Sequence, residues 1–242
     1  MLPKTPLAAT MIAVCLLAGC RSTLPWGDDP IRPEVNLAFT LEQNLIRLPS
    51  VEINHRSGRY FFGSAHQQSV LDPQFAATLG APRHELNLTA RETLRLSPRL
   101  LELQGVGDAI IGADAWAQRS VTIDYRTGLL TYQKQGIYPG DMEVFRFNGE
   151  PAIEIEVNGR TIRAVVDTAL PDTLVLPRGD AASGRTRANV VIAGATFTSI
   201  DISLADVPAA RLGNRLLSRF LISIDYGRER IGLWRDPRIP IE

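Results

Sequence analysis

The chain is poor in the residues that form disulfides and zinc sites, and it has no net positive charge to attract nucleic acid. Its 242 residues include two cysteines, Cys15 and Cys20, both near the start, and three histidines. The rest of the chain therefore has no thiol for a disulfide or a zinc site, and the histidines show no metal-ligand spacing. Basic and acidic side chains are equal in number, so no net charge draws the chain to nucleic acid. We expect no metal, no cofactor and no nucleic-acid partner.

The sequence also lacks an apolar run long enough to cross a bilayer as a helix. The apolar run from Leu7 to Leu17 is short and follows Lys4, and Ala18-Gly19-Cys20 comes directly after it, as in a secretory signal peptide. The four residues Leu-Ala-Gly-Cys resemble the lipobox of bacterial lipoproteins, in which the cysteine becomes the first residue and carries lipid. This resemblance implies a lipid on Cys20, and Arg21 after it favours the outer membrane. An ordinary secretory signal with a chance cysteine is the alternative.

The predicted signal peptide covers residues 1–20. Residues 21 to about 33 contain Pro, Gly and Asp and show no apolar periodicity, which is typical of a tether, and the predicted tether covers residues 21–40.

The remainder contains a repeat with a period near one hundred residues. Residues 51–71 align without a gap to residues 155–175, 104 positions later, and share Glu, Asn, Arg and Ala residues. Residues 112–125 match residues 213–226, 101 positions later, and both stretches begin with Gly and end in Ile-Asp-Tyr. Two segments that repeat at nearly the same interval indicate a duplicated domain. We expect a first lobe over 41–140 and a second over 141–242.

Each repeat has the pattern of short strands. Residues 153–157 alternate strictly between apolar and charged, and Asn158-Gly159 predicts a hairpin turn into the next strand. Further hairpins are expected at 121–132 and 222–234. Helices are few: one framed by Asp72, Pro73 and Gly80, and short ones after Gly112 and Gly213. The prediction is an all-β fold made of two homologous β-barrel lobes with a few short helices.

These features together resemble the retropepsin-like and pepsin-like aspartic peptidases. In that family Asp-Thr-Gly ends a strand, and a later apolar-apolar-Gly motif packs beside it. Asp167-Thr168-Ala169 fits the first motif, while Ile110-Ile111-Gly112 and Leu212-Gly213 fit the second. The resemblance implies that Asp167, Thr168 and Ala169 belong to a catalytic loop. The repeat places Gly63-Ser64-Ala65 opposite them, so the first lobe lacks the partner carboxylate.

The missing carboxylate decides the chemistry. Such enzymes use two carboxyl groups that share one proton, one to activate water and one to polarise the scissile carbonyl. With Gly63 opposite, we expect Asp167 to be ionised and hydrogen-bonded by the region of Ser64 and Thr168. Those two hydroxyls are expected to link the loops across a lobe interface, the alternative being local turn caps. His66 is an alternative acid or metal-binding group.

A second carboxylate within the chain would have to come from elsewhere, and three aspartates are candidates: Asp72, Asp108 and Asp114.

Three functions remain open at this point. The first is a catalytically silent family member that binds an extended peptide or protein segment between its lobes by strand addition. The second is an active aspartic endopeptidase whose second carboxylate comes from another residue or from another copy in a homodimer. The third is a structural envelope lipoprotein. Residues 87–96 and 189–200 are expected to form flap-like regions over the cleft.

Overall fold

The computed structural model describes residues 33–80, 83–117, 119–133, 136–137, 142–179, 182 and 184–238. The predicted signal peptide with Cys20, and residues 21–32 of the predicted tether, lie outside these residues. The tether predicted over residues 21–40 is wrong for its last part, because residues 33–38 form a strand that pairs with residues 129–133. None of the helices in the described residues is long and apolar enough to cross a membrane.

The N-terminal half, residues 33–133, is built of short strands and two helices. Its elements are β1 (Pro33–Ala38), β2 (Thr40–Glu42), β3 (Leu45–Arg47), β4 (Glu52–Ile53), β5 (Tyr60–Phe62), β6 (Val70–Leu71), α1 (Pro73–Leu79), β7 (His84–Asn87), β8 (Thr93–Leu96), β9 (Arg99–Leu100), β10 (Ala109–Ile111), α2 (Ala113–Trp116), β11 (Ser120–Asp124) and β12 (Leu129–Gln133). The predicted helix frame is confirmed at α1, where Asp72 accepts the N–H of Gln74 and Gly80 adopts a φ of 62° at the end.

The C-terminal half, residues 142–238, has longer strands and one helix. Its elements are β13 (Glu143–Arg146), β14 (Ala152–Val157), β15 (Arg160–Val166), β16 (Leu174–Pro177), β17 (Gly184–Ile192), β18 (Ala195–Ala205), β19 (Ala210–Leu212), α3 (Asn214–Leu217), β20 (Leu221–Asp225) and β21 (Arg230–Trp234). The predicted alternation is confirmed in β14, which buries its apolar residues and exposes its two glutamates. Asn158 and Gly159 both have positive φ and turn the chain into β15.

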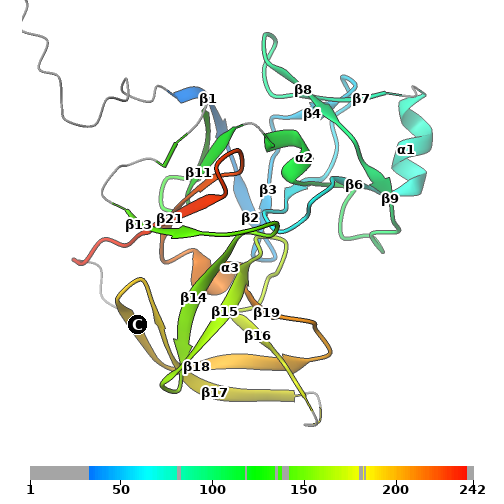
Figure 1. Ribbon diagram of the computed structural model, residues 1–242. Helices are drawn as coiled ribbons and strands as arrows, with labels where there is room; N and C mark the ends of the chain where they lie inside the picture. Colours follow the sequence, from blue (N-terminus) through cyan, green and yellow to red (C-terminus); the bar gives the residue numbers. More distant parts are fainter. Residues whose placement is uncertain are drawn as a thin grey trace, which may run out of the picture. The chain divides into compact units, whose positions relative to one another are not determined.

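Strands in the two halves pair in a similar order, but only the strands of the C-terminal half close into a barrel. Six strands of the C-terminal half form a closed barrel in the order β14-β15-β19-β16-β18-β17, which is the lower part of Figure 1. In the N-terminal half the strands form two open sheets, β2-β3-β5-β10-β6-β9 and β4-β7-β8. The fold is mostly β with three short helices among the described residues, as predicted, but the prediction of a closed barrel in each half holds only for the second.

Prolines explain why the N-terminal half stays open. In the barrel, β14 pairs with both β15 and β17, and β18 pairs with both β17 and β16. The corresponding stretches of the N-terminal half are each split in two, β3 from β4 around Pro49 and β8 from β9 around Pro98. Proline has no N–H to donate to a ladder, so it interrupts a strand that would otherwise join two sheets.

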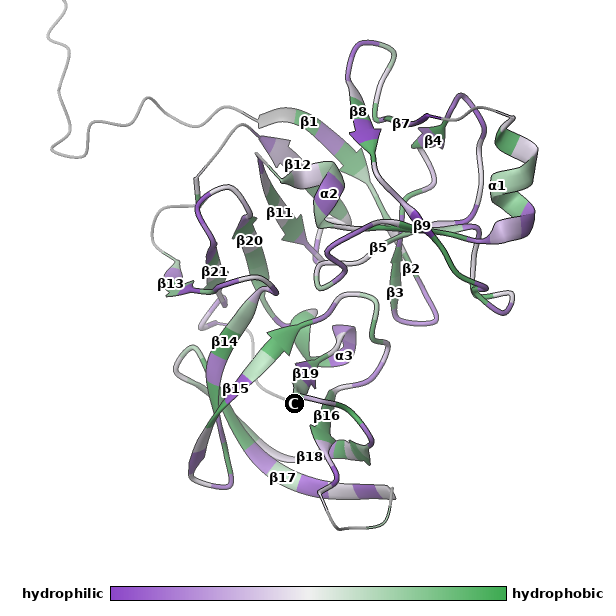
Figure 2. Cartoon of the chain, turned by 45° about the vertical axis from the view of Figure 1, so that its right-hand side comes forward, coloured by the Kyte–Doolittle hydropathy of each residue, from purple (hydrophilic) through white to green (hydrophobic). Residues whose placement is uncertain are grey.

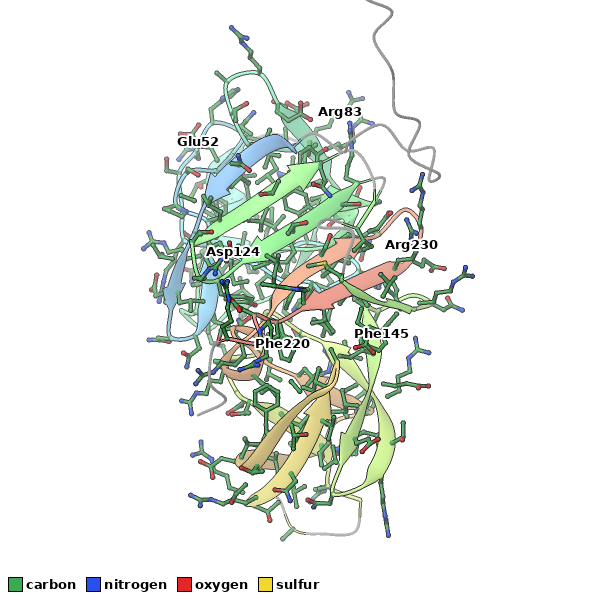
Figure 3. All side chains as sticks on the ribbon, turned by 90° about the vertical axis from the view of Figure 1, so that its left-hand side faces the viewer. Glu52, Arg83, Asp124, Phe145, Phe220 and Arg230 are labelled. Atoms are coloured by element: carbon green, nitrogen blue, oxygen red, sulfur yellow. The ribbon has the colours of Figure 1, made fainter. Side chains whose placement is uncertain are left out.

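A third six-stranded sheet joins the halves in the order β1-β12-β11-β20-β21-β13. Figure 3 looks onto this sheet and labels Phe145 on β13 and Arg230 on β21. At its centre β11 runs antiparallel to β20 with Thr122 opposite Ser223, its own counterpart in the repeat 101 residues later, and their hydroxyls are 3.0 Å apart. An antiparallel ladder centred on two equivalent residues relates β11 and β20 by a local two-fold axis.

A continuous hydrophobic core runs through both halves. Strands β11 and β20, coloured as hydrophobic in Figure 2, contribute Ile123 and Ile222 to it, and both side chains are fully buried. Trp116 packs between the rings of Phe62 and Tyr132, with centroids 5.8 and 5.6 Å away. Because one core serves both halves, we expect them to unfold together.

Candidate functional site

Two loops built on the same plan follow β5 and β15. Strand β5 pairs in parallel with β10, as β15 pairs with β19. After β5, the N–H of Gly63 donates to the carbonyl of Ile111 at 2.9 Å, and after β15 the N–H of Asp167 donates to the carbonyl of Leu212 at the same distance. The main chain therefore places residues 63 and 167 in equivalent positions, as the repeat predicts.

Two glycines let each loop approach the strand beside it. A Cβ on Gly112 would lie 2.6 Å from the carbonyl oxygen of His66, and one on Gly213 would lie 2.7 Å from that of Leu170. These contacts are too close for any side chain, so only glycine fits at either position. The helices predicted after the two glycines are confirmed as α2 and α3.

The hydroxyls of Ser64 and Thr168 hold the loops against each other. The N–H of Ser64 donates to Thr168 Oγ1 at 2.8 Å, and the N–H of Thr168 donates to Ser64 Oγ at 3.0 Å. Each hydroxyl in turn donates to a carbonyl of the other half, Ser64 to Val166 at 2.6 Å and Thr168 to Phe62 at 2.9 Å. Both side chains are fully buried. These bonds run between the loops and do not cap local turns.

Two tyrosines support the loops from the joining sheet. Tyr226 donates its hydroxyl to the carbonyl of Ser64 at 3.2 Å. Tyr125, its counterpart, donates to Asn214 Oδ1 at 2.7 Å, and Asn214 Nδ2 donates to the carbonyl of Thr168 at 2.6 Å. Burial raises the pKa of both tyrosines, which keeps them protonated as donors. Sequence reasoning missed this role, although both tyrosines end the repeated Ile-Asp-Tyr.

Asp167 is buried, with 6% of the residue exposed, and its carboxylate forms an ion pair with an arginine. Its Oδ2 accepts from Arg211 Nη1 at 2.8 Å, and its Oδ1 accepts from the N–H of Ala169 at 3.0 Å. We expected the region of Ser64 and Thr168 to hydrogen-bond this carboxylate. The two hydroxyls do not, because each donates its proton to a main-chain carbonyl of the other half.

Arg211 connects Asp167 to a second acid, Glu150. Its Nη2 donates to Glu150 Oε1 at 3.3 Å. Burial would lower the pKa of Arg211, but the hydrogen bonds and charges of Asp167 and Glu150 outweigh burial and raise it. Sequence reasoning missed Arg211 and Glu150. The available signal was Arg211 in the motif before Gly213, where the other repeat has the apolar Ile110.

On the opposite side, Ile110 fills the space that a side chain at position 63 would need. A Cβ on Gly63 would lie 2.5 Å from Ile110 Cγ2 and 2.8 Å from His66 Cδ2. Ile110 lies in the middle of β10 and Arg211 in the middle of β19. At equivalent positions, the N-terminal half thus pairs Gly63 with Ile110, and the C-terminal half pairs Asp167 with Arg211.

The three other aspartates considered as a second carboxylate are held elsewhere. Asp72 accepts from the N–H groups of Gln74 and Leu103, Asp108 from that of Arg59, and Asp114 from those of Ser69 and Ser97. No hydrogen bond among the described residues joins any of them to Asp167.

His66 is half-buried beside this ion pair. Burial lowers its pKa, and the nearby charge of Asp167 opposes that effect only in part, so the imidazole is neutral at pH 7. A neutral imidazole does not take the place of a protonated carboxylic acid at this pH. Within the described part of the chain, no three His, Cys, Asp or Glu side chains are grouped so as to hold a metal ion.

A cavity of about 370 Å³ opens beside the ion pair. Its lining residues come from both halves and are Ala65, His66, Gln67, Gln68, Arg99, Glu150 and Arg211. The flap-like regions predicted at 87–96 and 189–200 form parts of two hairpins, β7–β8 and β17–β18.

The two equivalent loop positions therefore hold one carboxylate, that of Asp167, and one glycine, Gly63. Asp167 is ion-paired, and its counterpart position offers no proton donor. Such a site can bind polar groups but lacks the shared proton on which acid–base hydrolysis by two carboxyl groups depends. No protein-family model matches this chain, and no curated protein matches it either.

Proposed function

We propose that this chain is a non-proteolytic protein with the fold of retropepsin-like and pepsin-like aspartic peptidases. Its lobes, residues 41–140 and 141–242, would bind an extended peptide or protein segment between them. A lipid on Cys20 would hold the protein at the bacterial outer membrane, facing the periplasm. The order and spacing of the repeated motifs support this family, as do the matching hydrogen bonds of the two loops.

One observation carries the proposal against cleavage: Arg211 forms an ion pair with Asp167, the one carboxylate at the two equivalent loop positions. An endopeptidase of this type needs a protonated and an ionised carboxyl group in contact. Arg211 Nη1 lies 2.8 Å from Asp167 Oδ2, so the guanidinium occupies one side of the carboxylate. Ile110 and His66 leave no room for a carboxylate at position 63. A dimer that brought in a second Asp167 would first have to displace this arginine.

Binding is supported by an open sheet edge beside the cavity. Strand β9 is the last strand of the sheet β2-β3-β5-β10-β6-β9, and its Arg99 lines the cavity. Leu100 and Leu101 are 61% and 47% exposed there. An unpaired edge with exposed apolar side chains is the surface to which an extended segment adds as a further strand.

The experiment is incubation of the chain from Arg21 onward with a diverse peptide mixture at pH 4 to 7. Mass spectrometry should find no cleavage, while pull-down with the same protein should recover peptides. Asp167→Asn is the matched control for cleavage. Cleavage that this variant abolishes would overturn the non-proteolytic assignment, and failure to retain any peptide would favour a structural envelope role.

The lipid anchor is tested separately in cells. Cys20→Ser should move the protein from the membrane fraction to the soluble periplasm. An unchanged membrane fraction would remove the support for lipid attachment without affecting the peptide-binding proposal.

A further inference from the structure

We propose that the cavity beside β9 recognises a carboxylate of the bound segment through Arg99. This inference rests on the proposed function and specifies which segments bind. The carboxylate belongs either to an acidic side chain or to the end of the bound chain.

Among the described residues that line the cavity, one cation, Arg99, has no ion-pair partner. Arg211 already bridges Asp167 and Glu150. His66 is uncharged at pH 7, with Arg99 and Arg211 among the causes that lower its pKa, after burial. Arg99 is exposed, and no acidic group in the described residues lies within ion-pair distance of it. Among the described residues at the cavity, Arg211 has two acidic partners and Arg99 has none, so Arg99 is the guanidinium left to meet an anionic group of a ligand.

The strand edge directs a segment toward this arginine. The N–H groups of Arg99 and Leu101 donate to the carbonyls of Ser69 and Leu71, on the side of β6. Main-chain groups alternate along a strand, so those of Leu100 face the open edge. A segment that pairs with Leu100 runs past Arg99 at the neighbouring position, where a guanidinium can bind a carboxylate through two parallel hydrogen bonds.

Glu150 sets the upper limit of the ligand's negative charge. Its carboxylate lines the same cavity, with 39% of its side chain exposed. Glu150 repels any anion, and it repels a phosphate with nearly two charges more strongly than a carboxylate, whose single charge matches that of Arg99. The exposed amides of Gln67 and Gln68 can donate further hydrogen bonds without adding charge. The site therefore fits a carboxylate and not a phosphopeptide.

The test is fluorescence anisotropy with a library of octapeptides on a Val/Thr background. One arm carries a single Glu at each position with both ends blocked, a second carries Gln instead, and a third has no acidic side chain but a free C-terminus. A charge-assisted bond of this kind should make the best Glu or free-carboxylate peptide bind about tenfold more tightly than its Gln or amidated match. The arm that shows the preference identifies the source of the carboxylate.

Variants assign the preference to Arg99. Arg99→Gln should abolish the tenfold difference, and Arg99→Glu should reverse it in favour of Lys peptides. Arg95→Gln, an exposed arginine on the neighbouring strand β8, is the matched control and should keep it. Equal binding of Glu and Gln peptides, or a preference that survives Arg99→Gln, would overturn this inference and leave the proposed function standing. If no peptide of any arm binds, the proposed function fails, and this inference fails with it.

Discussion

The loops after β5 and β15 share one backbone plan and differ in the side chains that decide chemistry. Both depend on a glycine that allows close approach, and both are linked by a hydroxyl to the other half. One loop then presents Gly63 beside Ile110, and the other presents Asp167 beside Arg211. The difference teaches that two loops can keep the same backbone plan while their side chains diverge, because main-chain and hydroxyl bonds hold them.

The largest effect is expected from removing the arginine of this pair. Arg211→Met leaves Asp167 buried and, among the described residues, with the N–H of Ala169 as its remaining hydrogen-bond partner. An uncompensated buried charge should lower the free energy of unfolding by about 3 kcal/mol, measured by urea denaturation at pH 7.

Two controls separate a buried ion pair from an ordinary one. Arg187→Met breaks the pair with Asp201, in which both side chains are 70% exposed, and should cost less than about 1 kcal/mol. Removing both charges with Asp167→Leu and Arg211→Met should restore most of the loss. If Arg211→Met costs no more than Arg187→Met, the ion pair does not constrain the site.

The hydroxyls of Ser64 and Thr168, which link the loops, should contribute nearly equally to the free energy of unfolding. Ser64→Ala leaves the N–H of Thr168 and the carbonyl of Val166 without a partner, and Thr168→Val does the same to Ser64 and Phe62. Each variant should lose about 2 kcal/mol of unfolding free energy, because buried polar groups become unsatisfied. A large loss for one and none for the other would show that the loops are not equivalent in energy.

Much of the scaffold was predictable because it depends on local patterns. The alternation in β14, the Asn158-Gly159 turn and the frame of α1 were read correctly, since each rests on residues close in sequence. The repeat also paired residue 63 with 167 and 64 with 168. An internal repeat predicts such distant pairs because equivalent positions of the two copies face each other in the fold.

The rest depended on contacts that no local pattern encodes. The partner of Asp167 is Arg211, 44 residues away, and Glu150 joins through the same guanidinium. The open N-terminal half follows from Pro49 and Pro98, which look like ordinary loop residues until the continuous strands of the barrel are compared with them. The link between the loops was expected at Ser64 and Thr168, but the carbonyls that accept from their hydroxyls, those of Val166 and Phe62, lie in the opposite half and follow no local pattern.

A smaller effect is expected from adding a methyl group at position 63. Gly63→Ala places a Cβ against Ile110 and His66, which should cost about 1–2 kcal/mol of unfolding free energy through overpacking. Ile110→Ala should relieve part of that cost in the double variant, and a double-mutant cycle measures the coupling. If the two changes are additive, Ile110 does not fill the space opposite Asp167.

The smallest effect is the pH dependence contributed by His66, whose counterpart in the other loop is Leu170. Burial lowers the folded-state pKa of His66, while Asp167 and Glu150 oppose and Arg99 and Arg211 reinforce the shift. Below about pH 6.5 the unfolded chain takes up a proton that the folded chain does not, so the free energy of unfolding falls as the pH drops from 7.5 to 5.5. His66→Leu, which gives this loop the residue of its counterpart, should make that dependence flatter in urea denaturation. The same slope in both proteins would mean that His66 is not held neutral by its surroundings, and that the two loops differ less in their electrostatics than their side chains suggest.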